Sequence, residues 1–330
     1  TLAAEMIINN ELDQGPEFPP ATVKSIIERA PQCITHTGRE APYGYVDWWP
    51  LSLMFNTQEK PYGDPKVRWA MAYAIDQQQL VDIGQIGAGQ VTNVPYPFYP
   101  PLLKYIDGAK DIIDQYNVLE VDLQKSEDLM LEAGFTKDDE GFWVDADGNR
   151  PDADIYASAT FFADTAPLMA EQLRAAGFDA KHVDPPTVWT DVDIGTAILH
   201  MWGHGGSIAD PFYTLNMYHI DKVRPNGESC GDNRPRWSNQ AFSDIVDEMA
   251  AQLPTLATYF GIKGYDHLWN DYSPEGNEAI ADLMRGQLAR IDALGEPTGE
   301  WAGLATRVAQ EELSRHVADY EAKEHLLDIN

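Results

Sequence analysis

The stretch LSLMFNTQEKPYGDPKVRWAMAYAIDQQQLVDI, residues 51–83, decides the fold. It opens with an apolar run, Leu51 to Phe55, which predicts a buried strand followed by a loop rich in turn residues. Asp64 then stands at a helix N-cap position, and Pro65 stands at the first helical position, where its missing amide is not needed. Apolar residues follow at helical spacing and predict a helix over residues 64–75 with one buried face. These residues are Val67, Ala70, Met71, Ala74 and Ile75.

A second capped helix is predicted directly after the first. Asp76 is its expected N-cap, and Gln79 stands three residues later as the reciprocal partner of a capping box. Arg68 lies in the first helix beside the apolar stripe, near Asp64 and Asp76. An arginine in that place covers apolar surface with its stem while its guanidinium pairs with carboxylates. We therefore expect Arg68 to be structural.

The same stretch resembles a known protein family. An FN dipeptide, a proline-containing loop with DP, then VRWAMAYAID and an apolar QLV resemble the signature segment of the extracellular solute-binding proteins of family 5. These are the oligopeptide, dipeptide, nickel and oligosaccharide receptors of ABC importers. The resemblance implies an α/β fold, a periplasmic binding protein-like lobe in which helices flank a mixed sheet. It covers residues 45–250 well and the flanks loosely.

The resemblance also divides the chain. Residues 1–45 match the tail of the N-terminal lobe and the crossover, residues 46–250 the C-terminal ligand-binding lobe, and residues 251–330 a helical return segment. Because the signature lies mid-chain in the family, we expect most of the N-terminal lobe to be absent from this chain. With one wall of the cleft missing, the chain alone is expected to bind its solute weakly and to expose an apolar half-cleft through which it self-associates.

The composition excludes several kinds of partner. The chain has 53 acidic and 23 basic residues and a formal net charge of −30. Such a field repels phosphate backbones and anionic membrane surfaces, so no nucleic-acid or lipid partner is expected. No apolar run approaches the roughly 18 residues of a membrane span. Cys33 and Cys230 lack the spacing of a zinc or redox motif, and both a single disulfide and two free thiols remain open.

Helix and turn signals predict the remaining elements. Helices are expected over residues 3–8, 23–29, 121–135, 166–178, 236–250, 280–291 and 304–320. The segments LEAGF and RAAGF end two of them, with Gly134 and Gly177 supplying the positive φ of a helix C-cap. Residues 84–101 are rich in glycine and proline and predict a loop. The segment DADGN mimics part of a calcium loop, but its glycine is misplaced and no Glu stands at the twelfth position, so a hairpin turn through Asp147-Gly148 is favoured.

Motifs for metal binding and catalysis find little support. His200 and His204 have the spacing of a helical zinc pair, but the glycines at 203, 205 and 206 disfavour a helix there. No P-loop, GxSxG or CxxC motif is present. An enzyme, most plausibly a glycoside hydrolase, is therefore the weaker class, and a lobe reused as a protein-interaction module is a third. No cofactor or metal is expected.

The candidate binding site is a loop that begins at Trp202. In the peptide receptors of the family, the tryptophan of this loop lines the cleft, and an acidic residue three positions later binds the amino group of the peptide. That position is Gly205 here, and Asp210 matches the family's DP only if two extra residues are allowed. Glycine lets a ligand approach the backbone. The pair Trp48-Trp49 can supply flat platforms for sugar rings, although core packing explains most tryptophans.

We thus expect six ligand-binding residues: Trp48, Trp49, Trp202, His204, Gly205 and Asp210. The predicted function is the substrate-binding component of an ABC importer, which captures an oligosaccharide or a peptide by lobe closure. The missing carboxylate and the tryptophans favour an oligosaccharide or another uncharged solute over a peptide. The resemblance implies a periplasmic or extracellular location, a lipid anchor in the full-length protein, and an ABC permease as partner.

Overall fold

The computed structural model describes residues 2–15, 18–35, 37–44 and 47–252, and scattered positions between 273 and 323. The chain divides into two compact units, Thr1–Asp247 and Glu248–Asn330. The predicted helices over 280–291 and 304–320 lie largely outside the described residues. Within the described residues, no helix is both long and apolar enough to cross a membrane.

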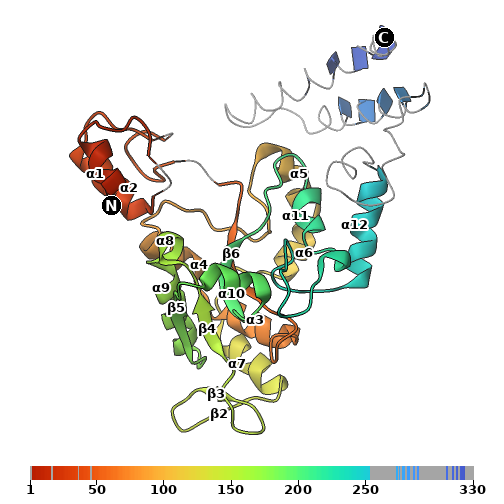
Figure 1. Cartoon of the computed structure of the whole chain (residues 1–330). Coiled ribbons are helices and arrows are strands. Elements are labelled where there is room, and N and C mark those ends of the chain that lie inside the picture. Colours follow the sequence, from red (N-terminus) through yellow and green to blue (C-terminus); the bar gives the residue numbers. More distant parts are fainter. Residues whose placement is uncertain are drawn as a thin grey trace. The chain divides into compact units, whose positions relative to one another are not determined.

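A four-stranded sheet forms the centre of the first unit (Figure 1). Its strands are β1 (Leu51–Phe55), β6 (Leu199–Gly203), β4 (Ala153–Tyr156) and β5 (Ala180–Val183), in that spatial order. Strand β4 runs parallel to both β5 and β6, whereas β1 runs antiparallel to β6. The expected α/β architecture with a mixed sheet is therefore confirmed.

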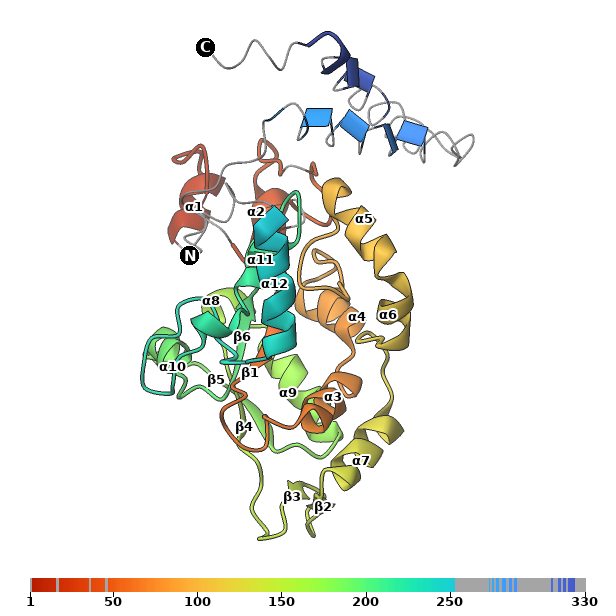
Figure 2. The same ribbon diagram turned by 90° about the vertical axis from the view of Figure 1, so that its right-hand side faces the viewer.

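Helices and short strands surround this sheet. They are α1 (Leu2–Ile8), α2 (Pro20–Arg29), α3 (Pro65–Tyr73), α4 (Gln77–Gln79), η1 (Leu80–Gly84), α5 (Pro100–Gly108), α6 (Lys110–Gln115), α7 (Leu123–Glu132), β2 (Thr136–Lys137), β3 (Trp143–Val144), α8 (Ala159–Phe162), α9 (Thr165–Ala175), α10 (Val188–Ile194), α11 (Phe212–Asn216), η2 (Ile220–Lys222) and α12 (Gln240–Gln252). Helices α3, α7 and α9 lie on one side of the sheet and α10 lies on the other (Figure 2).

The register of β1 against β6 sorts their side chains between two faces. Leu53 pairs with Met201 and Phe55 with Leu199, and all four pack into the main apolar core. The alternate pairs, Met54 with His200 and Ser52 with Trp202, point to the opposite face because side chains alternate along a strand. Met54 and His200 are buried as well, so this part of the sheet is covered on both faces.

The signature stretch folds largely as predicted. Strand β1 has the predicted bounds, and Pro65 is the first residue of α3. The carboxylate of Asp64 accepts a hydrogen bond from the Lys66 amide at 2.8 Å. Such a cap satisfies one of the amides that a helix start leaves without a partner, a contribution of about 1 kcal/mol.

The predicted capping box at Asp76 is half correct. Its carboxylate accepts from the Gln79 amide at 2.9 Å. The reciprocal bond is absent, because the Asp76 amide donates instead to Gln172 Oε1, on α9, at 3.1 Å. Gln172 Nε2 in turn donates to Gln79 Oε1 at 2.7 Å. A tertiary contact thus replaces the local one and ties the start of α4 to α9.

Arg68 makes different contacts from those predicted. Its guanidinium donates to the carbonyl oxygens of Tyr62 at 2.5 Å and Gly63 at 3.1 Å, and not to a carboxylate. The side chain therefore closes the loop that leads into α3. Burial lowers the pKa of this arginine below its ordinary value.

The position of the predicted hairpin was wrong. A turn through Asp147-Gly148 is present and is held by the Asp145 carboxylate, which accepts from the Asp147 amide at 2.9 Å. The paired strands, however, are β2 and β3, which meet at an earlier turn over residues 138–142. There the Asp138 carboxylate accepts from the Phe142 amide at 2.9 Å. After the later turn, the chain enters the main sheet as β4 and does not pair with the strand before the turn. Ala153 and Ile155 of β4 are buried in the apolar core, and this burial stabilises β4 in the main sheet more than hairpin pairing would.

Other local predictions agree with the structure. Gly134 and Gly177 follow α7 and α9 with φ of 90° and 94°, as helix C-caps require. The two cysteines are free thiols, with Cys230 buried and Cys33 partly exposed. Of the two alternatives, a disulfide and two free thiols, the structure has two free thiols.

Candidate ligand-binding site

Aromatic residues gather at one edge of the sheet. Strands β4, β5 and β6 are parallel, so their carboxyl ends share this edge, and β1 starts at it because β1 is antiparallel. Phe161 follows β4, Trp189 follows β5, Trp202 lies near the end of β6, and Trp48-Trp49 precede β1. Ligands of open α/β sheets bind beyond the carboxyl ends of the strands. We term these five residues the aromatic cluster.

Four rings of the aromatic cluster, those of Trp49, Trp202, Trp189 and Phe161, pack edge to face. The Trp202 ring centroid lies 5.5 Å from that of Trp49, with an interplanar angle of 85°. It lies 4.7 Å from the Trp189 centroid, at 75°. Phe161 extends the row, with its centroid 6.3 Å from that of Trp189. Near-perpendicular contacts of this kind are favourable for aromatic quadrupoles and fix the rings relative to one another.

Much of this aromatic surface is open. Trp48 is 47% exposed, Phe161 43% and Trp189 39%. Trp49 and Trp202 are partly buried beneath them. Trp143, by comparison, is 2% exposed and belongs to the core. Contiguous exposed aromatic surface is uncommon on a soluble protein and marks a binding surface.

Two glycines let the tryptophans lie against the loop backbone. A Cβ atom on Gly203 would lie 2.1 Å from Trp49 Cδ1, and one on Gly206 would lie 1.9 Å from Trp48 Cε3. Neither distance is possible without moving an indole ring. The close approach of ring and backbone therefore requires glycine at both positions.

Gly205 serves a different contact. A Cβ atom there would lie 2.2 Å from Met217 Sδ, and the Gly205 amide donates to the same sulfur at 2.7 Å. Met217 follows α11 and fills the space that the sequence analysis assigned to an approaching ligand. The loop is fastened further by Ser207, whose hydroxyl accepts from the Thr214 amide at 3.0 Å.

His204 connects β1, β6 and the segment after α11. Its Nε2 lies 2.7 Å from Ser52 Oγ, and its Nδ1 is hydrogen-bonded to Tyr218 Oη. Burial lowers the pKa of His204 to about 4 and raises the pKa of Tyr218, so both are uncharged at pH 7. The contact with Ser52 has the form of a nucleophile and base. A histidine oriented by a neutral tyrosine, and with so low a pKa, is a poor general base.

His200 does not join His204 in a metal site. It lies in β6, with 1% of its surface exposed, and neither ring nitrogen makes a hydrogen bond of good geometry within the described residues. Burial lowers its pKa to about 3. Over the part of the chain that the structure describes, no three His, Cys, Asp or Glu side chains are grouped to hold a metal ion.

Asp210 lies at the end of the loop. Its Oδ1 accepts from the Phe212 amide, in the first turn of α11, at 2.8 Å. The carboxylate is partly exposed, and one of its oxygens is engaged by the backbone. It therefore supports the loop conformation through the start of α11.

Arg234 is a site residue that the sequence analysis missed. Its guanidinium carbon lies 4.5 Å from the centroid of Trp202, in a cation–π contact. Trp189 and Phe161 were missed too, because the order of the strands in the sheet decides which loops meet. A signal was available only in part: each of these two aromatic residues follows the end of a strand within a few positions.

Arg236 is a buried residue near the aromatic cluster, and the sequence analysis missed it as well. It is 1% exposed and donates to four backbone carbonyls. The acceptors are the oxygens of Asp193 at 2.8 Å, Arg224 at 2.9 Å, Pro225 at 3.2 Å and Glu228 at 2.8 Å. One side chain thus fastens the long segment after η2 to the end of α10.

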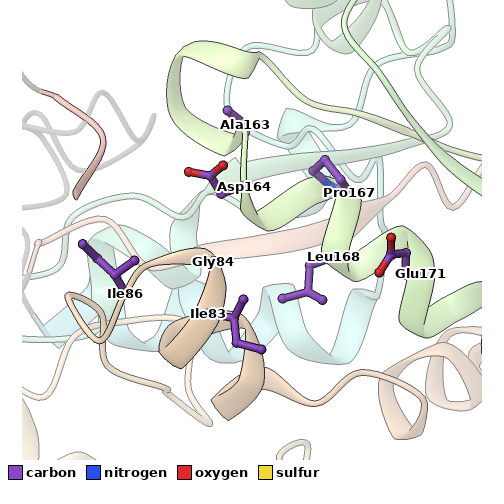
Figure 3. Close-up of a pocket in the computed structure, with 8 residues that line it drawn as sticks. All are labelled: Ile83, Gly84, Ile86, Ala163, Asp164, Pro167, Leu168 and Glu171. Atoms are coloured by element: carbon purple, nitrogen blue, oxygen red, sulfur yellow. The ribbon is translucent and has the colours of Figure 1, made fainter. Parts of the chain in front are cut away.

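A hollow that is separate from the aromatic cluster lies between η1 and α9 (Figure 3). Its volume is about 480 Å³. Ile83, Ile86 and Leu168 form its apolar walls, and the carboxylates of Asp164 and Glu171 lie at its rim. None of the six predicted ligand-binding residues lines it.

Comparison with known proteins identifies the family. A family model described as bacterial extracellular solute-binding proteins, family 5 Middle, matches residues 1–223. Among curated proteins, Heme-binding protein A from Haemophilus influenzae is 31% identical over 93 residues, which are 28% of this chain and 15% of that protein.

Solved structures share the fold. A periplasmic oligopeptide-binding protein of an oligopeptide ABC transporter from Thermotoga maritima, with bound mannohexaose, is 23% identical with a TM-score of 0.64; the match covers 75% of this chain and 46% of that chain. The oligopeptide-binding protein AppA from Bacillus subtilis, in complex with a nonapeptide, is 16% identical with a TM-score of 0.54 and the same coverage. The chain thus spans less than half the length of these proteins. Because the family model covers more than half of the chain, the protein belongs to the bacterial extracellular solute-binding proteins of family 5.

Proposed function

We propose that this protein is the substrate-binding component of an ABC importer and that it captures an oligosaccharide on the aromatic cluster by lobe closure. The observation that carries the proposal is the exposed aromatic surface at the carboxyl edge of the sheet, made by Trp48, Trp49, Phe161, Trp189 and Trp202. Sugar rings present flat C–H faces that pack on indole rings. The near-perpendicular indoles offer such faces in more than one direction.

A peptide is the alternative ligand. It is favoured by relatives that are named for oligopeptide binding, one of which holds a nonapeptide. Against it stands Gly205, which occupies the position where the family's peptide receptors carry an acidic residue for the amino group. The uncharged side chain of Met217 fills the space beside Gly205, where a carboxylate at this position would lie. The relative from Thermotoga maritima, which holds mannohexaose, illustrates that this fold accommodates a sugar chain.

Calorimetry on a receptor that carries both lobes, with neutral oligosaccharides and with di- to pentapeptides, tests the proposal. We expect saturable oligosaccharide binding without turnover. Trp202→Ala should weaken it about 30-fold, because the loss of a central aromatic contact removes about 2 kcal/mol of binding free energy. Trp69→Ala is the matched control, since Trp69 packs on Tyr73 of α3 outside the site, with ring centroids 5.7 Å apart. Tight peptide binding without oligosaccharide binding would refute the proposal, and cleavage of the glycan would favour a hydrolase.

The proposal includes a location and a partner. Members of the family are periplasmic or extracellular. We propose that this protein is held near the membrane by a lipid anchor and that its ligand-bound form docks on an ABC permease. Co-purification of the protein with a permease in the presence of ligand, and its loss without ligand, tests the docking step.

A further inference from the structure

Among the residues that the structure describes, none offers a polar partner to the guanidinium of Arg234. Every other arginine described between residues 2 and 252 donates to a carboxylate or a backbone carbonyl. The backbone amide of Arg234 donates to the Asp232 carbonyl at 2.9 Å, but its guanidinium makes no hydrogen bond or ion pair within the described residues. The contact of the guanidinium is the face of Trp202, 4.5 Å away. A guanidinium without an oxygen partner, held beside an exposed aromatic surface, has its N–H groups available for a ligand.

Two acidic side chains of this region, those of Asp232 and Asp193, make hydrogen bonds to other groups. The Asp232 carboxylate accepts from Lys222 Nζ at 2.7 Å. The Asp193 carboxylate accepts from the Ser229 hydroxyl at 3.0 Å. His200 and Tyr218, on which the charge of Arg234 acts, are uncharged at pH 7 because burial lowers the pKa of the former and raises that of the latter. In a chain of net charge −30, this arginine is left as a local positive centre.

The backbone around Arg234 is fixed before any ligand arrives. Asn233 is fully buried, and its amide group closes a ring with Trp237, donating to the Trp237 carbonyl at 2.9 Å and accepting from its amide at 3.1 Å. The Pro235 carbonyl accepts from the Thr57 amide at 2.8 Å. A charged group on a rigid turn loses little conformational entropy on binding, which is the condition for selective recognition.

We propose that the ligand is an acidic oligosaccharide and that Arg234 binds a carboxylate of one of its sugar units while neighbouring units pack on the aromatic cluster. A guanidinium stacked on an indole leaves its edge open, and that edge matches a carboxylate with two parallel hydrogen bonds. The inference rests on the proposed function, because it assigns the saccharide to the same site.

The test compares one sugar chain with and without its charge. Calorimetry on the receptor that carries both lobes is performed with a uronic-acid oligosaccharide of four to six units and with its methyl ester, which keeps the rings and removes the charge. We expect the acid to bind at least tenfold more tightly, as hydrogen bonds to charged groups imply. Arg234→Gln should abolish this difference between acid and ester, because glutamine carries no charge to pair with the carboxylate.

Two further variants separate charge, geometry and folding. Arg234→Lys keeps the positive charge but loses the two parallel N–H groups of the guanidinium, so it should retain only part of the preference for the acid over the ester. Arg174→Gln is the matched control, since Arg174 stacks on Phe142 at 5.0 Å and pairs with Asp179, near the amino end of β5. It should leave both affinities unchanged, and melting temperatures check that each variant is folded.

The outcomes distinguish the inference from the function on which it rests. Equal binding of acid and ester, or a preference that survives Arg234→Gln, overturns the inference and leaves oligosaccharide capture standing. Absence of binding by any saccharide overturns both. In another outcome, the protein binds no saccharide and prefers peptides with a free C-terminus over amidated ones. If Arg234→Gln removed that preference, Arg234 would bind a peptide carboxylate, which also overturns the inference.

Discussion

Replacement of the buried Arg236 should cause a large loss of stability. Arg236→Met keeps most of the apolar stem but removes the hydrogen bonds to the carbonyls of Asp193, Arg224, Pro225 and Glu228. Each hydrogen bond to a charged group contributes about 1.5–3 kcal/mol, and a buried acceptor left without a partner costs about 1–3 kcal/mol. Since bonds from one side chain are not additive, we expect a loss of about 3–5 kcal/mol.

Urea denaturation followed by circular dichroism measures this loss. The midpoint should fall while the slope stays constant, because the surface exposed on unfolding does not change. For a unit of this size, each kcal/mol lowers the melting temperature by about 2–4 °C. Arg224→Met is the matched control: that side chain is exposed and donates to the carbonyls of Asp221 and Val223 in its own turn. A loss below about 1 kcal/mol for Arg236→Met, or an equal loss for the control, would show that these hydrogen bonds do not hold the segment.

Three further outcomes are expected. The pKa of His200 is about 3, below the ordinary 6.5, so the folded state binds fewer protons than the unfolded state, and stability falls as pH drops from about 6.5 toward 3. Between pH 5 and 6, His200→Leu should reduce the dependence of stability on pH by about 1.4 kcal/mol per pH unit. Urea denaturation at a series of pH values measures this dependence, and a dependence equal to that of the wild type would contradict the assignment. Gly203→Ala should displace the neighbouring indole, shift tryptophan fluorescence and cost about 1–3 kcal/mol, whereas Gly108→Ala, with no atom within 4 Å of the new methyl group, should do neither. Iodoacetamide should label Cys33 in the native protein far faster than the buried Cys230, whose thiol pKa is raised by burial; equal rates by mass spectrometry would speak against this burial.

Local signals predicted the elements of the signature stretch. Strand β1 and helix α3 follow from an apolar run, an N-cap aspartate and a proline at the first helical position, and each of these acts within a few residues. Gly134 and Gly177 ended their helices for an equally local reason. The predicted partner of Asp76 was wrong because Gln172, distant in sequence, supplies a competing hydrogen bond.

The composition of the site depended on contacts that no local pattern encodes. Trp189, in α10, and Trp202, near the end of β6, meet because the carboxyl ends of β5 and β6 lie at the same edge of the sheet. Gly205 was interpreted as open space for a ligand, yet Met217 occupies that space from the segment after α11. The role of Arg236 depends on carbonyl oxygens that only the folded backbone gathers around it. The sequence names Trp48, Trp49 and Trp202 as candidates, whereas the side chains that pack around them could not be predicted from it.

The origin of the aromatic cluster has a consequence for how ligand preference changes in evolution. Phe161, Trp189 and the pair Trp48-Trp49 are carried by three separate segments outside the strands of the sheet, whereas Trp202 lies in β6. A substitution in one segment alters one wall of the site and leaves the hydrogen-bonded sheet intact, because loops accept changes that strands do not. On the proposed function, related receptors can acquire new solutes one wall at a time, and libraries that randomise a single segment should yield folded variants with shifted selectivity.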